Sequence, residues 1–295
     1  MYRLISLRRV LLWVLPAAAM LVSALIRWTA APAVPAANRP DEGVAVPIVM
    51  YHSLLPNGNS DYIITPALFE QDLQYLQQNG YTTVTVADLI AYADEGTPLP
   101  PKAVMLTFDD GYYNNYLYAH PLLQQYGMRA VLSPIGSVSA FYSDNPAEQD
   151  HPRYSHVTWA QLREMTASGV WEIQNHSDNL HKNDQNRKGA AKRKGETDGD
   201  YARVLTADLT AAQERLTTQV GVTPTAFVYP FGAYSAASQS VVEQLGFRAS
   251  LSCEEKVSRI TRSPDSLWRL GRYRRPPDID SRAFFETIFQ QAEDE

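Results

Sequence analysis

The sequence predicts an α/β fold, specifically a distorted (β/α) barrel of about seven parallel strands. From residue 44 onward, short apolar runs alternate with amphipathic segments of helical length, which is the order of parallel βαβ units. The apolar runs are continuous, and this indicates strands that are buried on both faces. An open doubly wound sheet is the alternative, but no G-x-G-x-x-G loop follows the first apolar run.

The individual elements can be placed in order along the chain. Strands are expected at 44–51, 81–86, 103–108, 128–135, 170–175, 225–229 and 248–252. Helices are expected at 65–80, 118–127, 158–169, 203–221 and 235–246. Thr65 followed by Pro66 marks the start of the first helix, and Thr158 caps the third.

The N-terminal segment has the order of an export signal. Three arginines lie within the first nine residues, and the run Val10 to Ile26 is uncharged and apolar. The run is close to the length that spans a bilayer, so we expect an uncleaved membrane anchor over residues 1–28, with a cleaved signal and a secreted protein as the alternative. Residues 29–43 form a Pro- and Ala-rich linker, and one catalytic domain is expected over 44–295, outside the cytoplasm.

Composition excludes several classes of protein. A formal net charge of −6 argues against general nucleic-acid binding, because no excess of cations is available to neutralise phosphates. Cys253 is the single cysteine, so neither an intramolecular disulfide nor an all-cysteine metal site is possible. The domain is therefore expected to be stabilised by its core alone, and we expect a monomer.

Polar residues follow several of the predicted strands. His52 follows the first, Asp109 and Asp110 the third, and His176 the fifth. The carboxyl ends of parallel barrel strands meet on one face, where active sites lie. We therefore expect these side chains to meet, although an ordinary Asp-Gly turn is the simpler explanation of the acidic pair.

The polar residues on this face predict a metal site. His176 and His181 are five residues apart at a strand exit, so a loop can bring both imidazoles to one ion. Two imidazoles and a carboxylate form a three-ligand set that leaves positions for water and substrate. The second Asp is then available to accept a proton from the attacking water. Ordinary loop histidines are the alternative.

Three motifs carry a family resemblance. The stretches "TFDDGY", "HSDNLH" and "YPFGAYS", in this order, resemble the polysaccharide deacetylases of carbohydrate esterase family 4, the NodB-homology domain. The resemblance covers about residues 44–252. The early "VMYH" and the longer His-to-His spacing are similar to the circularly permuted branch, which includes poly-N-acetylglucosamine deacetylases.

The resemblance implies roles for individual residues. Asp109 is the expected catalytic base, and the expected ligands of a divalent metal, most simply zinc, are Asp110, His176 and His181. The backbone N–H of Phe231 is expected to stabilise the oxyanion. Expected contacts to the polysaccharide substrate are Tyr112, Tyr229 and Pro230.

Two positions depart from the usual family pattern. No histidine follows His181, so His52 is our candidate for the general acid. Val228 stands where the family often has an arginine that orients the base. Arg269 or Arg272 can take that role, and ordinary surface cations are the alternative.

The expected activity is removal of acetyl groups from N-acetylglucosamine-type units of a polysaccharide. An O-acetyl esterase of the xylan type and an inactive glycan-binding relative are the alternatives. The Lys- and Gly-rich stretch Lys182 to Asp200 has no apolar face, and we expect a solvated loop there.

Overall fold

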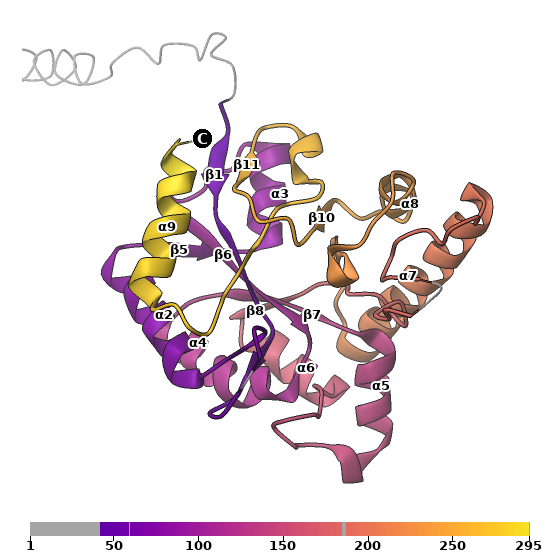
Figure 1. Ribbon diagram of the computed structural model, residues 1–295, viewed down its shortest axis with the longest axis horizontal. Coiled ribbons are helices and arrows are strands. Elements are labelled where there is room, and N and C mark those ends of the chain that lie inside the picture. Colours follow the sequence, from indigo (N-terminus) through magenta and orange to yellow (C-terminus); the bar gives the residue numbers. More distant parts are fainter. Residues whose placement is uncertain (1–41, 59, 185–186, 295) are drawn as a thin grey trace, which may run out of the picture. The chain divides into compact units, whose positions relative to one another are not determined.

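A six-stranded parallel sheet lies at the centre of the computed structural model (Figure 1). Its strands, in spatial order, are β12 (Tyr273–Arg274), β2 (Ile48–Tyr51), β6 (Ala103–Asp110), β7 (Ala130–Pro134) and β8 (Trp171–Ile173), with β5 (Thr82–Val84) also paired to β6. The structure describes residues 42–294 except 59 and 185–186, and Gly43–Glu295 forms one compact unit. The predicted anchor at 1–28 and nearly all of the predicted linker lie outside the described residues. No helix in the described part of the chain has the length and apolar character needed to cross a membrane.

A second parallel pair, β9 (Ala226–Val228) and β10 (Ala249–Leu251), extends the curve of the sheet. Only single bridges connect this pair to its neighbours: Asn175 beyond β8 pairs with Phe227, and Leu251 pairs with Leu270 ahead of β12. The strands are parallel as predicted, but a closed barrel is not formed. One reason is that the backbone leaves the extended conformation at Ser177, where φ is +73°, so the ladder beyond β8 ends after one pair.

Helices cover the sheet. They are α2 (Pro66–Gln78), α3 (Val86–Glu95), α4 (His120–Tyr126), α5 (Gly136–Asp144), α6 (Trp159–Ala167), α7 (Asp198–Val220), α8 (Ser238–Gln244) and α9 (Ser281–Asp294). In Figure 1 the helices α2, α4 and α9 lie together on one flank, while α5, α6 and α7 form a neighbouring group. Short helical turns occur at Asn115–Ala119, Pro146–Glu148, Pro230–Gly232 and Pro264–Leu267.

Two small strand pairs complete the fold. The strand β1 (Val44–Val46) pairs antiparallel with β11 (Ser258–Ile260), and β3 (Ser53–Leu54) pairs with β4 (Ile63–Ile64). The predicted strand 44–51 is thus divided at Pro47, which lacks the N–H that a central ladder requires.

Buried aromatic rings form the centre of the core under β6. The ring of Phe108 stacks on Tyr51 at 5.0 Å and meets Phe69 and Trp171 edge-on. Aromatic pairs of this kind contribute about 0.5–1.5 kcal/mol beyond the area they bury. The core thus fixes the strand that carries Asp109 and Asp110 directly after Phe108.

The predicted helix starts are confirmed where a side chain caps them. Thr65 accepts a hydrogen bond from the backbone N–H of Leu68, and Thr158 accepts one from Gln161. The expected strand 81–86 ends earlier, at Val84, because Thr85 and Asp88 form a capping box that starts α3. The helices α3, α5 and α9 and the strands β3, β4, β11 and β12 were not predicted.

Candidate metal centre and active site

The acidic pair belongs to the carboxyl end of β6, not to the turn after it. Asp109 and Asp110 pair in register with Ser133 and Pro134 of β7. The chain then turns sharply, with φ of +70° at Asp110 and +73° at Gly111. A Cβ at Gly111 would lie 2.8 Å from Pro134 Cβ, so glycine is required there. The turn leaves both carboxylates buried at the rim.

The structure brings Asp110, His176 and His181 together. Asp110 Oδ1 lies 3.4 Å from His176 Nε2 and 3.1 Å from His181 Nε2, and one ligand atom from each residue fits within 4.8 Å of the others. His176 Nδ1 lies 2.8 Å from the carbonyl oxygen of Val228. Because a carbonyl only accepts, Nδ1 donates to it, and Nε2 is the ring nitrogen that faces Asp110.

This donor set fits a divalent cation. The buried Oδ1 of Asp110 accepts no well-formed hydrogen bond from the described residues, so its charge faces the two imidazoles without a proper donor. Burial favours the neutral acid, yet the two imidazoles outweigh this effect and hold the pKa of Asp110 well below its usual value. Burial likewise opposes charge on His181, but the Asp110 carboxylate raises its pKa overall. Two imidazoles and one carboxylate are donors that zinc and similar transition metals accept.

Asp109 is held by a buried arginine. Arg272 Nη1 and Nη2 donate to the two oxygens of Asp109 at 2.7 and 2.8 Å, and the Arg272 side chain is fully buried. Burial favours the neutral acid, but the Arg272 guanidinium more than compensates and lowers the pKa of Asp109. Of the two arginines considered from sequence, Arg269 instead lies exposed, over the ring of Tyr234.

His52 stands on the other side of Asp109. Its Nε2 lies 4.0 Å from Asp109 Oδ2, and its side chain is 15% exposed. Burial is the main cause that lowers the pKa of His52, so its imidazole is neutral at pH 7 in the absence of substrate. Its ring contacts Tyr62 edge-on at 4.9 Å.

Two asparagines that we did not consider from sequence position the His52 loop. Asn115 Nδ2 donates to the carbonyl oxygen of His52 at 2.7 Å, and Asn114 Oδ1 accepts from the N–H of Leu54 at 2.9 Å. Both asparagines are fully buried. They end the stretch "DDGYYNN", and the presence of two amides at the start of a helix next to the acidic pair was the available signal.

The motif "YPFGAYS", which begins at Tyr229, has residues both on the rim of the site and in the core. Phe231 has φ of +57° and a side chain that is 39% exposed, and its ring lies 4.3 Å from that of His181. Tyr229 and Pro230 are buried, which corrects the expectation that their side chains contact substrate: β9 directs Tyr229 into a cluster with Phe227. Tyr112 is half-buried, and burial, together with the nearby Asp110 carboxylate, raises the pKa of its hydroxyl.

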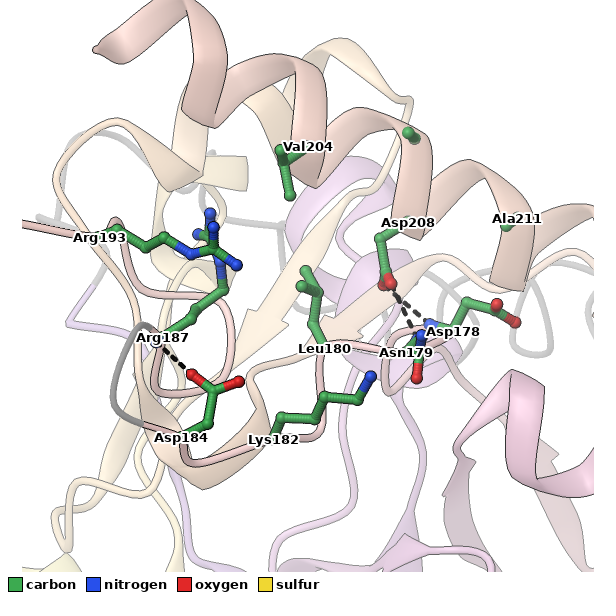
Figure 2. A pocket seen from close by; sticks show the side chains of 11 residues that line it. Asp178, Asn179, Leu180, Lys182, Asp184, Arg187, Arg193, Val204, Asp208 and Ala211 are labelled. Atoms are coloured by element: carbon green, nitrogen blue, oxygen red, sulfur yellow. Dashed lines mark hydrogen bonds between the residues drawn. The ribbon is translucent and has the colours of Figure 1, made fainter. Parts of the chain in front are cut away.

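The loop between the two histidines is fixed from α7. Both oxygens of Asp208 accept backbone hydrogen bonds, from Asp178 at 2.9 Å and from Asn179 at 2.8 Å (Figure 2). Asp178 Oδ1 also accepts from Arg215 Nε at 2.8 Å. A cavity of about 540 Å³ lies between this loop and α7, but none of the three candidate metal ligands lines it.

The described residues of the following stretch, 182–184 and 187–200, are more anchored than a solvated loop would be. Arg187 is buried and donates to Glu196 at 2.6 Å and to the carbonyl oxygen of Ala191 at 2.7 Å. Ala190 is fully buried, and its carbonyl oxygen accepts from the hydroxyl of Tyr201. Buried polar contacts replace the missing apolar face, and α7 already begins at Asp198.

The fold and the donor set together define an α/β protein with a candidate metal centre of two histidines and one carboxylate at the carboxyl ends of its strands. The chain belongs to the polysaccharide deacetylase family, whose model matches residues 96–250.

Three similar proteins agree with this assignment. The poly-beta-1,6-N-acetyl-D-glucosamine N-deacetylase of Escherichia coli (strain K12) is 33% identical over 203 residues, which cover 62% of this chain but only 30% of that relative. The solved de-N-acetylase from Aggregatibacter actinomycetemcomitans has a TM-score of 0.69 and 26% identity, covering 83% of this chain and 99% of that one. IcaB from Ammonifex degensii has a TM-score of 0.68 and 25% identity, covering 85% and 98%.

Proposed function

We propose that this protein is a metal-dependent hydrolase that removes N-acetyl groups from N-acetylglucosamine-type units of a polysaccharide. The observation that carries the proposal is the placement of Asp109, clamped by Arg272, next to the cluster of Asp110, His176 and His181. The names of the E. coli and Aggregatibacter relatives support N-deacetylation, and the name of the E. coli relative also supports a β-1,6-linked polymer.

Asp110, His176 and His181 would hold the metal, for which we propose zinc. When bound, such a cation polarises the acetamide carbonyl and makes water a better nucleophile. Asp109 is the general base that takes the proton from the attacking water. Its lowered pKa keeps it ionised, and both of its oxygens are held in place by Arg272.

The remaining steps need a donor to the oxyanion and a donor to the leaving amine. The N–H of Phe231 serves the first role, and its positive φ turns the backbone beside His181. His52 serves the second, because an amine leaves only when protonated. Its imidazole is neutral before reaction, so the proton that Asp109 takes from the attacking water passes to His52, whose Nε2 lies 4.0 Å from Asp109 Oδ2, and from there to the leaving amine.

We further propose an extracytoplasmic location, with residues 1–28 as the membrane anchor, residues 29–43 as a linker, and a monomeric catalytic domain over 44–295. The polymeric nature of the substrate supports this location, because relatives act on a polysaccharide by name.

Acetate release tests the proposal. The zinc-loaded protein should release acetate from a β-1,6-linked N-acetylglucosamine hexasaccharide, and Asp109→Asn should lower the rate by roughly 100-fold or more while metal content is unchanged. Asp110→Ala should lose both activity and metal. Faster release from acetylated xylan would indicate the esterase alternative, and binding of the hexasaccharide without acetate release would indicate an inactive glycan-binding protein.

A further inference from the structure

A series of aromatic rings extends from the metal centre along the rim segment 136–157, which contains α5 and follows β7. We refer to this series as the aromatic row. Four members, Tyr112, His156, Tyr142 and Phe141, are joined by ring contacts, and the fifth, Tyr154, is joined through its backbone carbonyl, which accepts from the Tyr142 hydroxyl. The segment returns to the site at its end. Val157 N donates to the carbonyl oxygen of Gly111 at 2.8 Å, and Tyr113 N donates to that of Ser155 at 2.9 Å. The row is therefore built onto the turn that carries Asp110.

Ring contacts connect the first four members of the row step by step. Tyr112 lies two residues beyond the candidate ligand Asp110, and its ring lies 4.6 Å from that of His156. His156 in turn stacks on Tyr142 at 5.5 Å. The ring of Tyr142 then contacts that of its sequence neighbour Phe141 edge-on at 5.2 Å. The row thus leads from the metal centre outward.

The outer end of the row is exposed. Phe141 is 51% exposed and Tyr154 is 49% exposed, and Tyr154 stacks on the exposed ring of His151 at 3.8 Å. Single exposed apolar side chains are ordinary on protein surfaces. These two differ because they belong to one connected segment: Phe141 continues the ring contacts that begin at Tyr112, and the backbone carbonyl of Tyr154 accepts from the Tyr142 hydroxyl.

Hydrogen bonds order the backbone that carries the exposed rings. The Tyr142 hydroxyl donates to the carbonyl oxygen of Tyr154 at 2.7 Å, and Asn145 Nδ2 donates to that of Phe141 at 2.7 Å. Ser155 Oγ donates to the carbonyl oxygen of Glu148 at 2.7 Å. A surface that is already ordered loses little conformational entropy when it binds a ligand.

The chemistry of the surface fits a sugar chain. A pyranose ring presents a C–H face that packs on an aromatic ring and a border of hydroxyl groups that need polar partners. Exposed polar groups flank Phe141 on this segment, including Asp144, Asn145 and Glu148. The two separated rings offer too little contiguous apolar surface for a stable protein interface, and the acidic neighbours disfavour an anionic membrane surface.

We propose that the aromatic row is an accessory glycan-binding surface, on which Phe141 and Tyr154 hold sugar units of the polymer beyond the unit at the metal centre. The proposal rests on the proposed function, because it gives the row the same polymer as its occupant. It makes affinity depend on chain length: a hexasaccharide reaches both the centre and the outer rings, whereas a disaccharide at the centre does not.

Binding measured by calorimetry in an Asp109→Asn background tests this inference without turnover. The probes are β-1,6-linked N-acetylglucosamine oligosaccharides of two and six units. The Phe141→Ala/Tyr154→Ala double variant should bind the hexasaccharide about tenfold more weakly, with less than about a twofold change for the disaccharide. Phe141→Tyr/Tyr154→Phe retains both rings and should keep the affinity for the hexasaccharide.

The exposed apolar residue Ile279 lies outside the row, so Ile279→Ala is the matched control and should bind both probes as the parent does. Unchanged hexasaccharide affinity in the double alanine variant, equal losses for both lengths, or no hexasaccharide binding by the parent would each overturn the inference. Length-dependent binding through these rings without acetate release by the zinc-loaded wild type would overturn the proposed activity alone. Acetate release by the zinc-loaded wild type, together with unaltered hexasaccharide binding in the double alanine variant, would contradict the glycan-binding role of the aromatic row and leave the proposed activity standing.

Discussion

Backbone strain is concentrated at single residues of the candidate site. Five non-glycine residues in the described part of the chain have positive φ, and three of them are Asp110, Ser177 and Phe231. Each is a candidate ligand, the neighbour of one, or the proposed oxyanion donor. A left-handed conformation is unfavourable for such residues and persists where the surroundings fix it, commonly at functional sites.

Arg272 determines the ionisation of Asp109, and this can be tested by pH. Its charge lowers the pKa of Asp109, so the base is ionised above that lowered pKa. Arg272→Gln should lower kcat/KM for acetate release at neutral pH by roughly 100-fold. It should also move the acidic limb of the pH profile to higher pH, because the unpaired carboxylate then protonates more readily.

The exposed Arg269 provides the control for this experiment. Arg269→Gln should leave the acidic limb in place, and Arg272→Lys should move it less than Arg272→Gln does, since lysine keeps the charge but not the two-pronged geometry. An acidic limb that is the same in Arg272→Gln and wild type would contradict the assignment of Asp109 as base.

For single residues, the sequence was enough to identify the candidate metal ligands but not the arginine that binds Asp109. Motif spacing was enough to bring Asp110, His176 and His181 together. It did not distinguish Arg272 from Arg269, because both lie in "LWRLGRYRR" and only the path of the chain into β12 decides which one is buried. Tyr229 follows a strand like the site residues do, but its side chain faces the opposite way, into the core.

At the scale of elements, the metal loop is fixed by helices on two sides. From α5, the N–H of Gly136 donates to Ser177 O at 3.0 Å and that of Ser137 donates to Asp178 O at 3.1 Å. From α7, the Asp208 carboxylate accepts hydrogen bonds from the backbone N–H groups of Asp178 and Asn179 (Figure 2). The loop between His176 and His181 is therefore ordered before any ion binds.

Asp208→Asn should weaken zinc binding by roughly tenfold or more, as the loss of groups that support metal ligands commonly does. Asparagine keeps one acceptor oxygen, but its NH2 group would face a backbone N–H. Competition with a chromophoric chelator measures the affinity. Glu214→Gln removes an exposed charge from the same helix and should bind zinc as wild type does; equal affinity in Asp208→Asn would show that the loop is held without this contact.

Helices with clear caps and long periodic patterns were predictable, as α2 and α6 show. The short strand β12 and helix α9 were not, because two residues of strand carry no pattern and α9 is recognisable only by the buried face that it packs on α2. The interruptions in the ladder of the distorted barrel were not predictable for a related reason. Strand count and direction are encoded in the pattern of apolar runs, whereas continuity of the ladder depends on local turns such as that at Ser177.

At the scale of the whole molecule, a metal that binds only the folded state should stabilise the domain. The donors come from β6 and from the loop beyond β8, so unfolding separates them. At a free zinc concentration 100-fold above the dissociation constant, the expected gain is about 2.7 kcal/mol, or roughly 5–10 °C in Tm for a domain of this size.

Differential scanning calorimetry with and without a chelator measures this shift, and re-addition of zinc should restore it. Asp110→Ala should have the same Tm in both conditions. A wild-type Tm that does not respond to zinc would contradict a site that is assembled by folding.

The direction of β2 has a practical consequence. The chain enters the domain at Gly43 and Val44, runs through β1 and β2, and reaches His52 at the carboxyl end of β2. Eight residues of extended chain span about 25 Å, so the entry point is remote from the catalytic mouth. A surface or carrier coupled just ahead of Gly43 should therefore leave that mouth open to long polymers, which makes this end the one to choose for immobilising the enzyme.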